Sequence, residues 1–266
     1  MSEPRYTHGH HESVLRSHTW RTAENSAGYL LPHLRPGMSL LDVGCGPGTI
    51  TVDLARLVAP GRVLGIDASE AVLDRARTEA ANGGVGVEFA IGDVYALDLP
   101  DGSFDVVHAH QVLQHLPDPV AALRQMRRLC RPGGLVAARD ADYHGMFWYP
   151  RLPELDDWMA LYQQVARGNS AEPDAARHLL AWAHASGFED VTVTSTTWTY
   201  ASPDERQWWG GMWADRIAQS DLAEQAIDQR LATRDDLQHI SAAWRRWAAD
   251  PDGYFVIVNG EILCRA

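Results

Sequence analysis

Short apolar runs alternate with longer amphipathic stretches over the central part of the chain. The apolar runs cover the segments 39–43, 62–67, 87–91, 104–109 and 135–139. Runs of this length, bounded by turn residues, are typical of buried strands. Apolar residues recur at helical spacing between them, at 50–58, 70–82 and 119–129. Strands that alternate with helices predict a parallel, doubly wound α/β sheet.

The pattern differs on either side of this region. Residues 1–17 show no clear period, and 22–34 predict a helix that Pro36 and Gly37 end. After the fifth run, 146–149 are aromatic, 152–167 are amphipathic, and 174–186 predict a helix closed by Gly187. Residues 191–200 and 254–264 are predicted to be strands, and 204–249 a long helical insertion rich in tryptophan.

Chain length favours one hydrophobic core with insertions, because 266 residues lie near the upper limit for a single core. We therefore predict an N-terminal flap and helix over 1–36. A single domain then follows over 37–266, with lid insertions at about 143–173 and 201–250.

Composition narrows the functional classes. Hydrophobic residues make up 45% of the chain and charged residues 22%, and no apolar run reaches the ~20 residues of a membrane helix. The polar N-terminus lacks a secretory pattern, so we expect a cytoplasmic protein without a membrane partner. A formal charge of −12 disfavours nucleic acid as a partner. Three widely spaced cysteines argue against a disulfide framework or a thiolate metal site.

The segment 40–49 is the most informative, because it places Gly44, Gly46 and Gly48 at alternate positions between a predicted strand and a predicted helix. Glycine lets the backbone turn tightly and admits a ligand close to main-chain atoms. A dinucleotide-binding fingerprint would place its third glycine three residues after the second, whereas here the interval is two. The turn therefore suits a nucleoside that carries an amino acid rather than a diphosphate.

Acidic residues close the next two predicted strands. Asp67 follows the second strand, where a carboxylate can accept hydrogen bonds from both ribose hydroxyls. Asp93 follows the third and is placed to accept from an adenine amino group, while the apolar neighbours Ala68 and Val94 cover the ring. Taken alone, each aspartate would be interpreted as a turn residue or a helix cap. Their placement at successive strand ends favours a ligand crevice.

These motifs together resemble the class I S-adenosylmethionine-dependent methyltransferases. The resemblance is to the small-molecule branch, which includes the ubiquinone and menaquinone biosynthesis enzymes. It extends over residues 39–138, about 100 residues, and rests on five ordered motifs. They are Leu41-Asp42-Val43-Gly44-Cys45-Gly46-Pro47-Gly48, Gly65-Ile66-Asp67, Gly92-Asp93, Phe104-Asp105-Val106-Val107 and Leu129-Cys130-Arg131-Pro132-Gly133-Gly134.

The resemblance implies a seven-stranded Rossmann-like methyltransferase sheet and S-adenosylmethionine as the cofactor. It implies that the three glycines of the turn approach the amino acid part of the cofactor and that Asp42 holds the turn near its ammonium group. It also implies that His110 or Gln111 lies beside the methionine moiety, and His115 resembles a histidine often found in the helix that follows.

Methyl transfer is an in-line displacement, so the enzyme must position the acceptor and exclude water. An oxygen or nitrogen acceptor can also require a base. We expect the acceptor beyond the fifth strand, near Asp140, Asp142, Tyr143 and His144. His144, Asp142 and His115 are the candidate bases, with packing as a neutral residue the alternative for His115. A divalent cation on Asp140 and Asp142 is a minor alternative, because no further ligand can be identified and we predict no metal.

Aromatic residues of the insertions suggest a pocket for a flat or apolar acceptor. Trp148 and Trp213 are its candidate walls, with ordinary core packing as the competing interpretation. The N-terminal segment is expected to fold over the site. Arg21 or Tyr6 could then reach the cofactor carboxylate, and His18 and Trp20 could line the acceptor side. The scattered histidines of this segment lack the spacing of a zinc site.

Other functions remain open on the sequence alone. The fold also suits an aminopropyltransferase, although no acidic polyamine site is evident. A catalytically silent S-adenosylmethionine-binding regulator would retain the same glycine turn. The glycine spacing argues against a nicotinamide-dependent oxidoreductase. The sequence does not identify the acceptor, the methylated atom, the pathway or the oligomeric state.

Overall fold

The computed structural model describes residues 20–266, which fall into two compact units. Unit 1 comprises Ala141–Asp174 and Thr197–Asn259 among the described residues. Unit 2 comprises residues 20–140, Ala175–Thr196 and Gly260–Ala266. Three long strands run from one unit into the other, so the division cuts across secondary structure.

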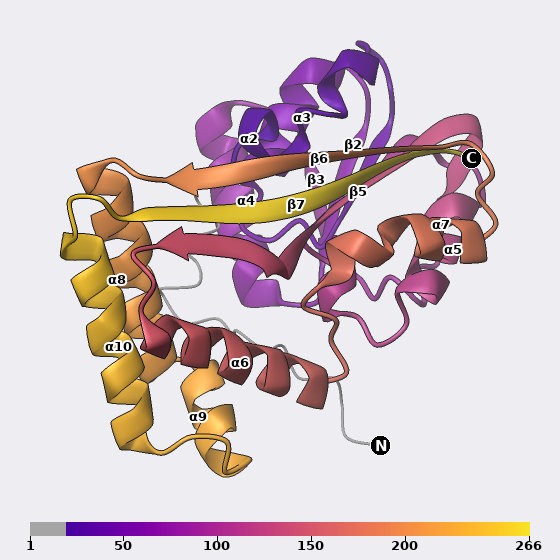
Figure 1. Ribbon diagram of the computed structural model, residues 1–266. Helices are drawn as coiled ribbons and strands as arrows, with labels where there is room; N and C mark the ends of the chain where they lie inside the picture. Colours follow the sequence, from indigo (N-terminus) through magenta and orange to yellow (C-terminus); the bar gives the residue numbers. More distant parts are fainter. Residues whose placement is uncertain (1–19) are drawn as a thin grey trace. The chain divides into compact units, whose positions relative to one another are not determined.

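Strands form a seven-stranded sheet with the order β3-β2-β1-β4-β5-β7-β6. Neighbours from β3 to β5 are parallel, whereas β7 runs opposite to β5 and β6 (Figure 1). The strands are β1 (Leu40–Val43), β2 (Val63–Asp67), β3 (Glu88–Ile91), β4 (Phe104–His110), β5 (Cys130–Tyr149), β6 (Val191–Tyr200) and β7 (Tyr254–Arg265). This mixed sheet confirms the predicted α/β class with seven strands.

Helices begin where the sequence supplies capping residues or proline. Asp118 caps α5, Ser202 caps α8 and Thr233 caps α10, each accepting a hydrogen bond from a backbone N–H of the first turn. The α-helices are α2 (Ala23–Ala27), α3 (Thr49–Val58), α4 (Glu70–Gly83), α5 (Pro119–Leu129), α6 (Pro153–Gly168), α7 (Leu179–Ala185), α8 (Pro203–Gln219), α9 (Asp221–Asp228) and α10 (Arg234–Ala249). Short 3-10 helices are η1 (Leu31–His33), η2 (Leu113–His115) and η3 (Ala175–His178).

Several predicted element bounds were wrong. The helical insertion predicted over 204–249 consists of three helices, because Ser220 and Thr233 each cap a new helix. The predicted helix over 22–34 divides into α2 and η1, and that over 174–186 into η3 and α7. The fifth strand was predicted over 135–139 but extends through the aromatic segment to Tyr149.

Each unit has its own core. In unit 2 the buried residues come from the parallel strands and their helices: β1 is buried along its whole length, as expected for a central strand. In unit 1 the core is aromatic and centres on Trp158, Trp213, Trp244 and Phe255. Over the described part of the chain, no helix is long and apolar enough to cross a membrane.

Candidate functional site

The turn between β1 and α3 is built from glycines in the left-handed region. Gly44, Gly46 and Gly48 have φ angles of 65°, 56° and 84°. A side chain is disfavoured there, which explains why the sequence uses glycine at these positions. Gly48 also precedes the first residue of α3, so the turn opens directly into a helix N-terminus.

The three glycines face different surroundings. A Cβ atom added at Gly44 would lie 2.5 Å from a methyl group of Val112, and one at Gly48 would lie 2.9 Å from the Cβ of Ala76. These two glycines therefore also serve packing. A Cβ at Gly46 would have no heavy atom within 4 Å. Gly46 is thus the member of the turn that faces open space.

Asp67, at the end of β2, closes the turn from the neighbouring strand. One carboxylate oxygen accepts from the Gly46 N–H at 3.0 Å, and the other accepts from the Ser69 N–H at 3.0 Å. A carboxylate has about four lone-pair positions, so two such bonds leave capacity for further donors. Ala68 beside it is exposed. The arrangement fits the prediction of a carboxylate that receives two hydroxyl groups.

Asp93 lies at the same sheet edge. Asp67 pairs with Ile91 in the parallel register of β2 and β3, and the Gly92 N–H donates to the Asp67 carbonyl at 3.1 Å. Asp93 itself is exposed and accepts from the Tyr95 N–H at 2.9 Å, whereas Val94 is buried. The structure therefore brings both acidic strand ends together, as the sequence predicted.

Asp42, in the strand that leads into the turn, is buried, and both of its carboxylate oxygens have hydrogen-bonding partners within the protein. His108 Nδ1 lies 2.8 Å from one oxygen, and the Thr51 hydroxyl donates to the other at 2.5 Å. Asp42 thus ties β1 to β4 and to α3. Its contact with the cofactor ammonium stays a prediction.

Arg21 contacts Gln111, which follows β4, where the methionine moiety of the cofactor is predicted to lie. The Arg21 guanidinium donates to the Gln111 Oε1 at 2.6 Å. Gln111 has a φ of 52°, which is unusual for a residue with a side chain, and its N–H donates to the Arg139 carbonyl at 2.6 Å. Strained backbone of this kind often marks functional sites. His110, just before it, is buried.

Two titratable groups with shifted pKa values follow β4 in the chain: the partly exposed His115 in η2 and the buried Asp140 in β5. Burial, assisted by the charge of Arg21, lowers the pKa of His115 to about 3. The Gln114 N–H donates to an Asp140 carboxylate oxygen at 3.1 Å, and burial raises the pKa of Asp140 to about 7. His115 therefore stays neutral at ordinary pH. Its Nε2 lies 3.1 Å from the Gln114 amide nitrogen.

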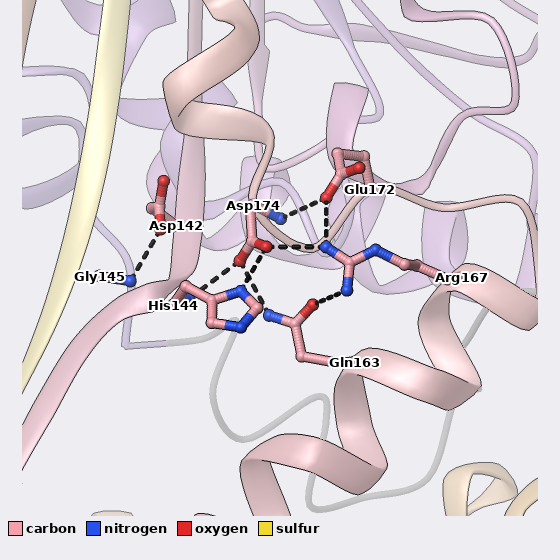
Figure 2. Close-up of polar contacts among 7 residues, drawn as sticks. All are labelled: Asp142, His144, Gly145, Gln163, Arg167, Glu172 and Asp174. Carbon is pink, nitrogen blue, oxygen red and sulfur yellow. Dashed lines mark hydrogen bonds and ion pairs between the residues drawn. The ribbon is translucent and has the colours of Figure 1, made fainter.

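In unit 1, His144 is held by an aspartate that the sequence analysis did not single out. Both the His144 N–H and Nδ1 contact the Asp174 carboxylate, at 2.9 Å and 2.6 Å (Figure 2). Asp142, the other candidate base on this strand, is buried and accepts from the Gly145 N–H at 2.7 Å. His144 is therefore fixed by a carboxylate, while Asp142 shapes the backbone of β5.

Asp174 collects further donors from α6. The Gln163 amide and the Arg167 guanidinium each donate to it at 2.8 Å. Although burial acts in the opposite direction, the hydrogen bonds from His144, Gln163 and Arg167 lower the pKa of Asp174 to about 2. No local motif marks Asp174, because its partner His144 lies 30 residues away in the sequence.

The predicted aromatic walls differ in burial. Trp213 is 1% exposed and packs edge-to-face on Trp158, so it forms part of the unit 1 core. Tyr143 is buried and stacks on Tyr162, with ring centroids 4.0 Å apart. Trp148 is partly buried at the edge of this core. Their role in an acceptor pocket stays a prediction.

The remaining predictions concern the N-terminal segment and metals. Trp20 is 39% exposed, while His18 and Tyr6 lie outside the described residues. Among residues 20–266, no group of three or more histidine, cysteine, aspartate or glutamate side chains has the geometry of a metal site.

Comparison with known proteins identifies methyltransferases as the relatives of this chain. A family model described as a methyltransferase domain matches residues 34–208. An uncharacterized methyltransferase of Schizosaccharomyces pombe is 35% identical over 99% of this chain and 98% of its own length. Demethylmenaquinone methyltransferase of Staphylococcus aureus is 36% identical over 48% of this chain and 51% of its own length.

Among solved structures, phosphoethanolamine N-methyltransferase 2 of Haemonchus contortus in complex with S-adenosyl-L-methionine has the same fold. Its TM-score is 0.53 at 18% identity, and the match covers 87% of this chain and 49% of that protein.

Proposed function

The chain belongs to the methyltransferase domain family and uses S-adenosylmethionine as its cofactor, and from this premise we propose that it methylates a small molecule with an aromatic or hydrophobic body. The cofactor supplies a methyl group on a positively charged sulfur, which makes that methyl electrophilic. The protein's task is then to hold the cofactor, orient the acceptor and exclude water.

The open space over Gly46 is the observation that carries the cofactor site. Gly46 combines a positive φ with room for a ligand against its backbone, and its N–H is held by Asp67. The three glycines of the turn would accommodate the amino acid part of the cofactor. Asp67 would accept the two ribose hydroxyls, in keeping with its remaining lone pairs.

Other residues of unit 2 complete the proposed cofactor site. Asp93, with Ala68 and Val94, would contact the adenine. His110 and Gln111 would lie beside the methionine moiety. Arg21 would pair with the carboxylate, and its bond to Gln111 supports a place at this end of β4.

The acceptor side is proposed from the residues beyond the buried part of β5. Tyr143 and Trp148 are the aromatic candidates of unit 1 for contact with the acceptor, and Trp213 would support them from the core. Of the candidate bases, His144 is the exposed one, because 54% of its side chain is accessible. His115 would act in packing, given its low pKa, and Asp142 in shaping the strand.

Calorimetric titration with S-adenosylmethionine and S-adenosylhomocysteine tests the cofactor site, with NAD as the control ligand. We expect binding of both sulfur ligands and none of NAD. Asp67→Asn should weaken binding by about 2 kcal/mol, because it removes a charge-assisted acceptor. Asp74→Asn makes the same charge change on the exposed face of α4 and should leave binding unchanged. Equal affinity of the two variants would refute the assignment of Asp67.

An acceptor screen that detects S-adenosylhomocysteine formation separates an enzyme from a silent cofactor-binding regulator. Transfer to a small molecule would establish the enzyme. Tight cofactor binding without product from any acceptor would favour the regulator.

A further inference from the structure

The outer edge of β6 is open over the part of the strand that lies in unit 2. β6 is the last strand of the sheet, with β7 on its inner side and no strand beyond it among residues 20–266. The stretch 191–196 belongs to unit 2. Val191 is partly buried, whereas 192–196 are all exposed, and Val193 is 47% accessible. The backbone N–H and C=O groups along such an edge can pair with a further strand.

This edge is held in place from its inner side. The hydroxyl groups of Thr194 and Thr196 both donate to the buried carboxylate of Glu261 on β7, the first at 2.6 Å. Successive side chains point to opposite faces of a strand, so Val193 lies on the other face from these threonines. The strand is therefore ordered before any partner arrives, which lowers the entropic cost of pairing.

The sequence of β6 lacks the features by which proteins protect an open edge. Edge strands are usually short, or they carry charged side chains or proline that hinder pairing. The ten residues of Val191–Tyr200 include neither a charged residue nor proline. Because 22% of the chain is charged, a segment of this length would carry about two charges at average composition. Uncharged β-branched residues at exposed positions instead favour pairing with another strand.

The opposite edge of the same sheet is protected. β3 is the other edge strand and has only four residues, Glu88–Ile91. Glu88 forms an ion pair of 2.9 Å with Arg62, just before β2. A short strand that begins with a charged pair is a poor template for a further strand. The open edge is thus a particular property of β6 and not of the sheet as a whole.

The charge of the protein indicates which partner suits this edge. A formal charge of −12 opposes contact between two copies of the chain, so self-association is favoured where the surface is uncharged. When two identical strands pair about a two-fold axis, a charged residue near the axis faces its own copy. The stretch 191–196 contains no such residue. A partner recognised by charge would gain nothing from this edge, whereas a second copy meets no repulsion there.

Symmetry also limits the register. A two-fold axis perpendicular to the sheet keeps every side chain on its own face, so one residue must lie opposite its own copy. An axis at Val193 places this residue against its copy and Thr192 against Thr194. Pairs of β-branched residues and of threonines stabilise antiparallel strands. In the same register Asp190 lies opposite Thr196, so that a carboxylate faces a hydroxyl group.

We propose that two copies of this chain associate through β6, whose stretch 191–196 pairs antiparallel with the same stretch of the second copy about an axis at Val193. The seven strands of each copy then join in one continuous sheet. The inference does not depend on the proposed function, because none of these residues belongs to the proposed cofactor site.

Sedimentation equilibrium of the full chain measures this association. The wild type should reach about 59 kDa, twice the 29.4 kDa of one chain. Val193→Lys and Val193→Glu each set like charges against one another and should weaken association about tenfold or more. Val193→Thr keeps an uncharged β-branched residue and should stay dimeric. Ile91→Lys places the same charge on the 61% exposed end of β3 and should also stay dimeric.

An equal mixture of Val193→Lys and Val193→Glu tests the register. The mixture sets opposite charges against each other at the axis and should restore the dimer mass. Hydrogen exchange of the wild type gives a test that needs no substitution. Amides of 192–196 should exchange more slowly at high protein concentration than at low, whereas amides of Glu88–Ile91 should not respond to concentration.

The contrary outcomes are distinct. A wild type that remains monomeric would overturn the inference, as would exchange at 192–196 that does not depend on concentration. A dimer that persists in Val193→Lys would show that another surface forms the interface. A mixture of the two charged variants that remains monomeric would overturn the pairing at Val193. None of these results bears on the proposed function, which the cofactor titration tests separately.

Discussion

Alanine substitutions at three glycines separate backbone strain, packing and ligand contact. Gly46, Gly44 and Gly84 all have φ angles between 56° and 65°. An alanine in this region costs about 1–2 kcal/mol because its Cβ approaches the following carbonyl oxygen. A Cβ would meet nothing within 4 Å at Gly46 or at Gly84, which ends α4. At Gly44 it would lie 2.5 Å from Val112, adding about 1–3 kcal/mol of overpacking.

We therefore expect Gly46→Ala and Gly84→Ala to lose a similar unfolding free energy in urea denaturation, and Gly44→Ala to lose more. Calorimetry with S-adenosylhomocysteine should then separate the first two. Gly46→Ala should weaken binding at least tenfold, about 1.4 kcal/mol, because its methyl group occupies the space of the ligand. Gly84→Ala should bind as wild type.

One result would refute this reasoning directly. If Gly46→Ala and Gly84→Ala bind S-adenosylhomocysteine equally well, the space over Gly46 does not hold the cofactor. The turn would then be a structural feature, whatever the family membership of the chain.

Further predictions concern the cores and the buried charges. Trp244→Ala should cost about 3–5 kcal/mol in urea denaturation, because the ring is fully buried; a loss below about 1 kcal/mol would contradict its place in the core. Glu261→Gln should cost about 3–5 kcal/mol, because it removes the charge of Glu261 from its buried ion pair with Arg139; an unchanged denaturation midpoint would contradict this. The pKa of Asp174 is lowered from 3.8 to about 2, so its stabilising contribution is present above pH 4 and is lost as the pH falls towards 2. The pKa of Asp140 is raised to about 7, so its contribution is present below pH 4 and is lost as the pH rises through 7. We expect the unfolding free energy of Asp174→Asn to fall furthest below that of the wild type near pH 8, in denaturation measured from pH 3 to 8. The unfolding free energy of Asp140→Asn should compare best with that of the wild type near pH 8. Variant and wild-type curves that run parallel over this pH range would contradict both assignments.

Local sequence signals predicted that the glycine turn and the two acidic strand ends lie at one edge of the sheet. The glycine turn and the acidic residues after β2 and β3 are each set within a few residues of a strand end, and parallel strands place those ends at one edge. The sheet and its class followed from the same periodicity. The bond between the Asp67 carboxylate and the Gly46 N–H joins two of the motifs, and only the structure shows it.

The carboxylate partner of His144 could not be predicted in the same way. Asp174 acquires its role from the packing of α6 against the segment after it, and no spacing in the sequence marks that contact. The helix boundaries within 204–249 were accessible in principle. Ser220 and the capping box of Thr233 are helix-start signals that the sequence contains, but the tryptophan-rich helical pattern around them was given more weight.

The path of the chain limits how this protein can be recombined with its relatives. The chain passes between the units inside β5, β6 and β7, at residues 140–141, 196–197 and 259–260. A chimaera that exchanges unit 1 must therefore be spliced within hydrogen-bonded strands rather than in loops. Because side chains alternate along a strand, a splice displaced by one residue would invert every following position. Successful exchanges should preserve the parity of all three junctions at once.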